Sequence, residues 1–296
     1  MQVTLLDGGM GQELVHRAGD PPTPLWSTQV MMDHPGLVQQ VHADYFAAGA
    51  TVATANTYAL LRDRLKVAGI EGRYEELIDA AMREAVAART AHGSGRIAGC
   101  TGPLGGSYRP DNHPATAEAV PLYAEQARLM APFADLMIAE TAASVQMAQA
   151  MSEGVLSAGR PFWLAVTVDD TDGTRLRSGE PLADVLPVLR DGAAAVLVNC
   201  SVPEVMPAAL DIVSRSGLPC GAYANAFTHI TEDFRRDAST VEALSARSDM
   251  GPLDYADHAL SWLDHGATIL GGCCETGPAH IAEIARRLTA AGHEIV

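Results

Sequence analysis

Residues 195–200 are Ala-Val-Leu-Val-Asn-Cys, a short apolar stretch that ends in a polar residue and a thiol. The stretch is rich in valine and does not alternate between apolar and polar side chains. This pattern is typical of a strand that is buried on both faces, as strands of parallel sheets are. It predicts a parallel α/β sheet in which Asn199 and Cys200 stand at the carboxyl end of one strand.

Similar apolar stretches recur along the whole chain, and each is followed by a segment with helical spacing. The other predicted strands are Val3–Asp7, Thr51–Ala55, Ile97–Thr101, Asp135–Glu140, Phe162–Val168, Leu218–Ala224 and Ala267–Gly272. The intervening segments place apolar residues on one face of a helix, for example after Pro181, a residue that is favoured in the first helical turn. Four helical segments are followed by glycines, where a C-cap requires positive φ: Gly49, Gly192, Gly217 and Gly266.

Eight strand–helix units without a linker predict a (β/α)8 TIM barrel that forms a single domain over residues 1–296. An open, doubly wound sheet is the alternative. Its dinucleotide-binding fingerprint is missing, because Gly-Gly-Met-Gly at residues 8–11 is not G-x-G-x-x-G. The long polar stretch Asn225–Leu253, which contains Arg235, Arg236 and Asp237, is expected to be a loop on the active face, either as a lid or without order.

The composition excludes several classes of partner. A net charge of −16 and scattered basic residues argue against nucleic acid. No apolar stretch approaches the roughly 18 residues that a membrane span needs. The N-terminal sequence MQVTLLDGG has no basic region before it and is predicted to be a strand instead of a signal peptide, so a cytoplasmic location is expected. The acidic charge would suit cationic ligands, or solubility alone.

The cysteines carry the strongest functional signal. Five cysteines in a chain without a secretory signal predict reduced thiols and not a disulfide framework. Cys200 ends the sixth predicted strand, and Cys273 and Cys274 follow the eighth, so the three thiols can converge over the mouth of a barrel. We expect Gly271 and Gly272 to give the chain the freedom that lets neighbouring cysteines face one site.

Three thiolates with one open position are typical of a catalytic zinc site, whereas a structural site is closed by four protein ligands. Cysteine is also a common buried residue, and we assign that simpler role to Cys100 and Cys220.

The chain resembles the homocysteine S-methyltransferase family over almost its full length. The segments that carry the resemblance are LLDGGMGQEL at residues 5–14, LWS at 25–27, ANTY at 55–58, GPLGGSY at 102–108, ET at 140–141, VNC at 198–200 and GGCCETGPAHI at 271–281. The resemblance implies a TIM barrel whose Zn²⁺ is bound by Cys200, Cys273 and Cys274, with the sulfur of homocysteine in the open position.

The resemblance also implies the substrate site. Asp7 and Glu140 would hold the ammonium group of homocysteine, and backbone N–H groups near Gly9 and Met10 would hold its carboxylate. Thr141 and Asn199 belong to matching segments and complete the expected substrate site, giving the set Asp7, Gly9, Met10, Glu140, Thr141 and Asn199.

An electron-rich sulfur would attack the methyl group of a cationic donor, and aromatic rings bind such cations. The expected donor-site residues are Trp26, Asn56, Tyr58, Tyr108, Tyr223 and Asn225. S-methylmethionine, another sulfonium or a betaine-like compound would serve as donor, although no aromatic residue follows Glu140 as in betaine-using members. Glu275, where the family often has glycine, would add a carboxylate near the metal.

The expected partners are therefore small molecules, without nucleic acid or a membrane, and a homo-oligomer is left open. Three other functions compete with the leading one. The zinc enzyme could methylate a different thiol or a selenol. The chain could act only with a corrinoid- or folate-carrying partner protein. The neighbouring cysteines could form a metal-independent redox sensor.

Overall fold

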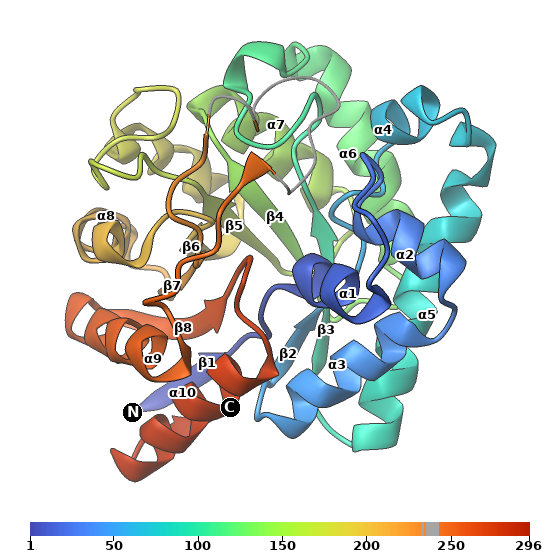
Figure 1. Cartoon of the computed structure of the whole chain (residues 1–296). Helices are drawn as coiled ribbons and strands as arrows, with labels where there is room; N and C mark the ends of the chain where they lie inside the picture. Colours follow the sequence, from blue (N-terminus) through green and yellow to red (C-terminus); the bar gives the residue numbers. More distant parts are fainter. Residues whose placement is uncertain (232–233, 235–242) are drawn as a thin grey trace.

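The computed structural model describes residues 1–231, 234 and 243–296, and a curved parallel sheet surrounded by helices lies at its centre (Figure 1). The strands are β1 (Gln2–Leu5), β2 (Val52–Thr54), β3 (Arg96–Thr101), β4 (Leu136–Ala142), β5 (Phe162–Val166), β6 (Ala193–Asn199), β7 (Cys220–Ala224), β8 (Ala267–Gly272) and β9 (Glu294–Ile295). All eight predicted strands are present, and their bounds differ from the prediction by at most two residues.

The sheet order is β2-β3-β4-β5-β6-β7-β8-β1-β9, and the neighbours are parallel. The chain closes the barrel between β1 and β2, where the Thr51 N–H donates to the Leu5 carbonyl at 2.7 Å and the Asp7 N–H to the Val52 carbonyl at 3.1 Å. The predicted TIM barrel is confirmed. The short strand β9 was not predicted, and it pairs with the first residues of β1 outside the ring.

The helices alternate with the strands and cover the outside of the barrel (Figure 1). They are α1 (Met10–Ala18), α2 (Ser27–Asp33), α3 (Leu37–Ala47), α4 (Arg62–Val67), α5 (Tyr74–His92), α6 (Thr116–Met130), α7 (Val145–Leu156), α8 (Met206–Val213), α9 (Pro252–Ser261) and α10 (Pro278–Ala290). Within the described ranges, no helix is long and apolar enough to cross a membrane.

The glycine caps are confirmed, since all four predicted glycines have positive φ between 75° and 112°. The helix predicted after Pro181 is wrong in type. The chain there forms two short 3-10 helices, Leu182–Val185 and Val188–Asp191. Pro187 lies between them and has no N–H group to continue a helical ladder, which explains the interruption.

The interior of the barrel is packed with side chains from β2 to β8 and with Leu6, which follows β1. These residues are Leu6, Val52, Ala98, Leu136, Ile138, Trp163, Ala165, Ala195, Leu197, Tyr223 and Ile269. A larger apolar cluster fills the space between the strands and the helices. The packed interior supports the carboxyl ends of the strands, where barrel enzymes assemble their sites.

The two ends of the loop predicted at Asn225–Leu253 pair with each other. The Thr228 N–H donates to the Ser245 carbonyl at 2.9 Å, and the Arg247 N–H to the Ala226 carbonyl at 2.8 Å. Its base is therefore ordered next to the end of β7. The basic and acidic residues that we noted in its centre, residues 235–237, lie outside the described residues, so the lid stays a prediction.

Candidate metal centre and active site

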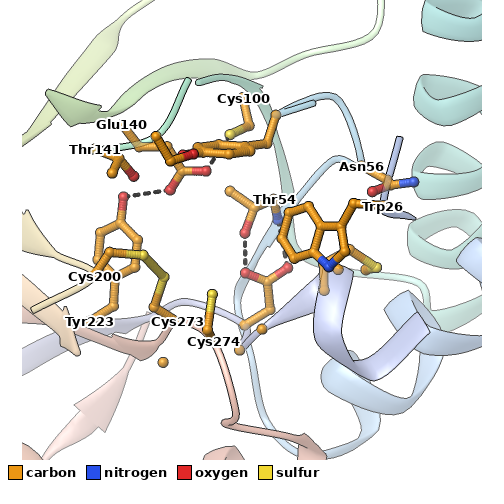
Figure 2. A pocket seen from close by; sticks show the side chains of 18 of the residues that line it. Trp26, Thr54, Asn56, Cys100, Glu140, Thr141, Cys200, Tyr223, Cys273 and Cys274 are labelled. Atoms are coloured by element: carbon orange, nitrogen blue, oxygen red, sulfur yellow. Dashed lines mark hydrogen bonds between the residues drawn. A yellow bond between two sulfur atoms is a disulfide. The ribbon is translucent and has the colours of Figure 1, made fainter. Parts of the chain in front are cut away.

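A pocket opens at the carboxyl ends of the strands, and it gathers residues from loops that are far apart in the sequence (Figure 2). All but two of the predicted site residues line this pocket. They are Asp7, Gly9, Met10, Trp26, Asn56, Tyr58, Tyr108, Glu140, Thr141, Cys200, Tyr223, Cys273 and Cys274. Figure 2 shows Trp26 and Asn56 on one side of the pocket and Cys200, Cys273 and Tyr223 on the other.

The sulfur atoms of Cys200, Cys273 and Cys274 lie within 4.8 Å of one another, the one group of three potential metal ligands among the described residues. A tetrahedral ion with metal–sulfur bonds of about 2.3 Å would hold its sulfurs about 3.8 Å apart. The three cysteines therefore fit a metal with small adjustments. Their thiolate chemistry favours a soft or borderline cation and leaves one position of a tetrahedron for a substrate.

In this structure a disulfide joins Cys200 to Cys273, so the prediction of reduced thiols is wrong for these two cysteines (Figure 2). The two Cα atoms are 5.8 Å apart, which lies within the usual range for bridged cysteines. The reason is that the ends of β6 and β8 bring the two thiols into contact. Reduction of this bridge is required before both sulfurs can serve as metal ligands.

Gly271 and Gly272 have a different role from the one predicted. Both are the last residues of β8, and neither has a positive φ. A Cβ atom on Gly271 would lie 2.6 Å from the Leu6 Cβ, and one on Gly272 would lie 2.0 Å from the Thr276 Oγ1. These glycines therefore allow close packing beneath the site. The chain turns just after them, at Cys274 and Glu275.

Strained backbone is concentrated at this pocket. Among the described non-glycine residues, those with positive φ are Trp26, Tyr108, Thr141, Cys200 and Glu275. The first four line the pocket, and the fifth follows Cys274. Such conformations each cost roughly 1–3 kcal/mol, persist only when the surroundings enforce them, and cluster at functional sites. Sequence reasoning did not predict them, because none of these residues is a glycine.

Asp7 follows β1 and is buried with its carboxylate turned to β2. The Thr54 N–H donates to Oδ2 at 2.7 Å, and the Thr54 hydroxyl donates to Oδ1. Burial raises the pKa of Asp7 to about 8, and the charge of Glu140 adds to this effect while the two Thr54 hydrogen bonds oppose it. A cationic group bound beside Asp7 would favour its ionised form and lower this pKa again.

Glu140 lies on β4 and receives two hydrogen bonds from other strands. The Cys100 Sγ donates to Oε1 at 2.6 Å, and the Tyr223 hydroxyl donates to Oε2 at 2.8 Å (Figure 2). Burial raises the pKa of Glu140, whereas both hydrogen bonds lower it. Cys100 is buried as predicted, but it also lines the pocket and orients Glu140, which sequence reasoning missed.

The surroundings of Cys274 disfavour its thiolate, so a cation close to its sulfur would be needed to ionise it. Burial raises the pKa of its thiol to about 12, and the negative charges of Glu275 and Glu140 contribute. A metal ion favours the thiolate strongly enough to deprotonate a coordinating thiol. The Glu275 side chain itself does not line the pocket: it accepts a hydrogen bond from the Gln12 Nε2 at 2.5 Å on the side of α1.

The turn before α1 approaches the cysteine loop closely. A Cβ on Gly9 would lie 2.5 Å from the Cys273 carbonyl oxygen, so only glycine fits there. The Gly9 N–H already donates to the Thr276 carbonyl at 2.8 Å, and the Met10 N–H to the Gly8 carbonyl at 2.9 Å. The role predicted for these two N–H groups in carboxylate binding therefore stays a prediction, and it would require them to exchange partners.

The aromatic side chains that line the pocket have different neighbours. The Trp26 and Tyr58 rings meet edge to face with centroids 6.2 Å apart, and the indole N–H of Trp26 donates to the Gln12 Oε1 at 2.9 Å. The Arg64 guanidinium lies 5.6 Å from the centre of the Tyr58 ring, and the Arg177 guanidinium lies 4.9 Å from the centre of the Tyr108 ring. Both tyrosines thus already contact a cation.

Asn199 and Asn225, the two other predicted site residues, do not line the pocket. The side chain of Asn199 is buried, accepts from the Thr141 N–H and donates to the Thr141 hydroxyl. The Asn225 Oδ1 accepts from the Phe227 N–H at 3.1 Å. Both amides are buried and hold backbone groups of neighbouring segments in place.

Several pocket residues were not predicted at all. They are Thr54, Arg64, Ser107, Phe227, Phe234 and Leu244. Thr54 ends β2 and could have been found from its place at a strand end. Arg64 lies on α4. The other four come from loops whose course was not predictable, and Phe234 and Leu244 belong to the loop after β7.

Comparisons with known proteins identify the family of this chain. The profile of the family described as homocysteine S-methyltransferase matches residues 4–288. The homocysteine S-methyltransferase of Escherichia coli K12 is 29% identical, over 96% of this chain and 95% of its own. A metallated crystal form of the homocysteine methyltransferase MmuM from Escherichia coli has a TM-score of 0.81 at 28% identity, over 97% of this chain and 96% of its own.

An oxidized crystal form of the same Escherichia coli enzyme has a TM-score of 0.80 and covers 96% of both chains. The fold, the three gathered cysteines and the family match over nearly the whole length lead to one assignment. The chain belongs to the homocysteine S-methyltransferase family and is a methyltransferase.

Proposed function

We propose that this protein transfers a methyl group from a small cationic donor to the thiol of homocysteine, which yields methionine, at a zinc ion held by Cys200, Cys273 and Cys274. The observation that carries the proposal is the position of three cysteine sulfurs within 4.8 Å of one another, beside Asp7 and Glu140 in one pocket. The names of the relatives and the metallated form of one of them support it.

Zinc, when bound, would supply Lewis-acid chemistry that lowers the pKa of a thiol and presents it as a thiolate near neutral pH. The three cysteine ligands of the protein carry three negative charges, so the centre would remain anionic and its sulfur nucleophilic. The chain itself needs no separate general base, because the thiol proton leaves to solvent when the substrate binds.

Asp7 and Glu140 would orient the amino-acid end of the substrate. Asp7 is buried and Glu140 is half-buried at the same pocket, and a substrate ammonium would offset the burial and the Glu140 charge that raise the pKa of Asp7. Thr54, Cys100 and Tyr223 hold the two carboxylates by hydrogen bonds, so the acceptor atoms are fixed before the substrate arrives. The substrate sulfur would then point toward the cysteines.

The donor would lie against the aromatic side of the pocket. Trp26 is the best candidate for its cation, because Tyr58 and Tyr108 already contact Arg64 and Arg177. In the transfer step a bond forms between the homocysteine sulfur and the methyl carbon, while the bond from that carbon to the donor breaks. The electron pair of the broken bond stays on the donor, which leaves as a neutral thioether or amine.

A donor panel tests the proposal. Reduced, zinc-loaded protein would be incubated with homocysteine and S-methylmethionine, another sulfonium or betaine, and methionine would be measured. We expect turnover by the isolated chain with a sulfonium donor. Turnover only after addition of a corrinoid or folate protein would instead support a partner-dependent module. Preference for a competing thiol or selenol would identify that compound, and not homocysteine, as the acceptor. Full activity without zinc would refute the metal proposal.

A further inference from the structure

A buried ion pair lies outside the pocket lining, in the segment that follows β5. The Arg177 guanidinium donates twice to the Asp170 carboxylate, at 2.7 and 3.1 Å, and the two side chains are only 10% and 12% exposed. Burial of such a pair involves a large desolvation cost, so its value for stability alone is small. Its contacts indicate a more specific role.

Arg177 is bonded directly to the main chain of a proposed metal ligand. Its Nη2 donates to the Cys200 carbonyl at 3.1 Å, and its Nε donates to the Thr167 hydroxyl at 2.9 Å, which in turn donates to the same carbonyl at 3.2 Å. Cys200 has a φ of 48°, a conformation that its surroundings must enforce. Two hydrogen bonds to its carbonyl fix the direction of its peptide group.

The pair also connects the other loops of the active face. The Asp170 carboxylate accepts from the Val202 N–H and from the Ile230 N–H, each at 3.2 Å, so it holds the chain after β6 and the loop after β7. The Arg177 guanidinium lies over the Tyr108 ring of the loop after β3. One ion pair thus contacts three loops besides its own.

We propose that Asp170 and Arg177 are positioning residues of the metal centre, which hold Cys200 in the conformation that directs its thiol toward Cys273 and Cys274. The inference rests on the proposed zinc site. It adds that the geometry of this site is set from outside the pocket, by the segment after β5. Removal of the pair leaves the ligands in place but lets the Cys200 turn relax.

Two variants test this role. Arg177→Lys keeps the charge but loses the planar guanidinium group, whose several N–H groups bind Asp170 and the Cys200 carbonyl at the same time. The double variant Asp170→Asn with Arg177→Met removes both charges and leaves no lone buried ion. Arg175→Lys is the matched control: it lies in the same segment, is 55% exposed, and contacts Gly179 and Asp172 instead of the site.

Two measurements are made on the full-length chain: the zinc affinity of the reduced form by competition with a chelator, and the equilibrium of the Cys200–Cys273 disulfide against dithiothreitol. We expect both test variants to bind zinc about tenfold to a hundredfold more weakly, as loss of outer-shell contacts does elsewhere. We expect the disulfide equilibrium to shift toward the thiols, because a relaxed Cys200 turn aligns the two sulfurs less well, and we expect the control to match the wild type in both measurements.

Circular dichroism verifies folding, and if the double variant does not fold, Arg177→Lys decides alone. Folded variants with unchanged zinc affinity and an unchanged disulfide equilibrium would overturn the positioning role. If the wild-type chain binds no zinc, the proposed function fails, but the disulfide equilibrium still decides whether the pair positions Cys200.

Discussion

Asn199 holds Thr141 from behind the active site by two hydrogen bonds. The Thr141 N–H donates to the Asn199 Oδ1 at 3.1 Å, and the Asn199 Nδ2 donates to the Thr141 hydroxyl at 2.9 Å. Thr141 has a φ of 65° and lines the pocket next to Glu140. One side chain on β6 therefore keeps a residue of β4 in a strained conformation.

The first prediction is that Asn199→Ala destabilises the protein and weakens substrate binding. Two polar groups of Thr141 would lose their partners in a buried place, which costs about 2 kcal/mol of unfolding free energy. The displaced Thr141 would also raise the KM for homocysteine. Denaturant unfolding and steady-state kinetics measure the two effects.

Asn112→Ala is the control, because Asn112 is exposed and donates one hydrogen bond to the Gly105 carbonyl. We expect it to change the unfolding free energy by less than about 0.5 kcal/mol. Equal effects of the two substitutions would contradict a special role for the pair Asn199–Thr141.

The second prediction concerns the pH dependence of homocysteine binding. Burial raises the pKa of Asp7 to about 8, so its carboxyl is neutral below that pH and cannot attract an ammonium group well. The KM for homocysteine should therefore rise as the pH falls below about 8, by at most about tenfold per unit. In Asp7→Asn the KM should be high, without this inflection. Thr54→Val removes a hydrogen bond that lowers the pKa and should move the inflection upward.

The third prediction follows from the same pKa shift but concerns stability. Between the ordinary Asp pKa of 3.8 and about 8, the folded state holds a proton that the unfolded state has released. The unfolding free energy contributed by Asp7 therefore falls as the pH rises through this range and is constant above it. We expect the melting temperature of Asp7→Asn, relative to wild type, to increase from pH 5 to pH 8. A constant difference would show that Asp7 is ionised throughout.

The barrel was predictable because the strand pattern is repeated eight times and stretches such as AVLVNC at 195–200 are apolar enough to be buried on both faces. The site was largely predictable for a related reason: polar residues at strand ends, such as Asp7 and Glu140, must meet on one face. The contacts that support the site residues were not predictable from the sequence. The left-handed conformation of Cys200 and the contact of Arg177 with its carbonyl depend on loop paths that no local pattern specifies.

The fourth prediction distinguishes the metal cysteines from the other buried thiols. Cys273→Ser should lower the zinc content of reduced protein from about one per chain to a small fraction, because a hydroxyl is a poor substitute for a thiolate on zinc. Cys220→Ser should retain the metal, since Cys220 is buried away from the pocket and donates to the Gly266 carbonyl. Elemental analysis of both variants, reduced and dialysed in parallel, gives the comparison. Retention of zinc by the first would exclude Cys273 as a ligand.

The last prediction concerns the close packing beneath the cysteines. Gly272→Ala would place a methyl group 2.0 Å from the Thr276 Oγ1 and 2.7 Å from its Cβ, so the cysteine loop must shift. We expect a loss of about 1–3 kcal/mol of unfolding free energy, together with weaker zinc binding.

Gly72→Ala is the matched control, because a Cβ there meets nothing within 4 Å and the backbone is not left-handed. It should change stability by less than about 0.5 kcal/mol and leave zinc binding unchanged. If the single Gly272→Ala variant is as stable as wild type and binds zinc normally, the loop has room to move, and Gly272 is not needed for the geometry of the site.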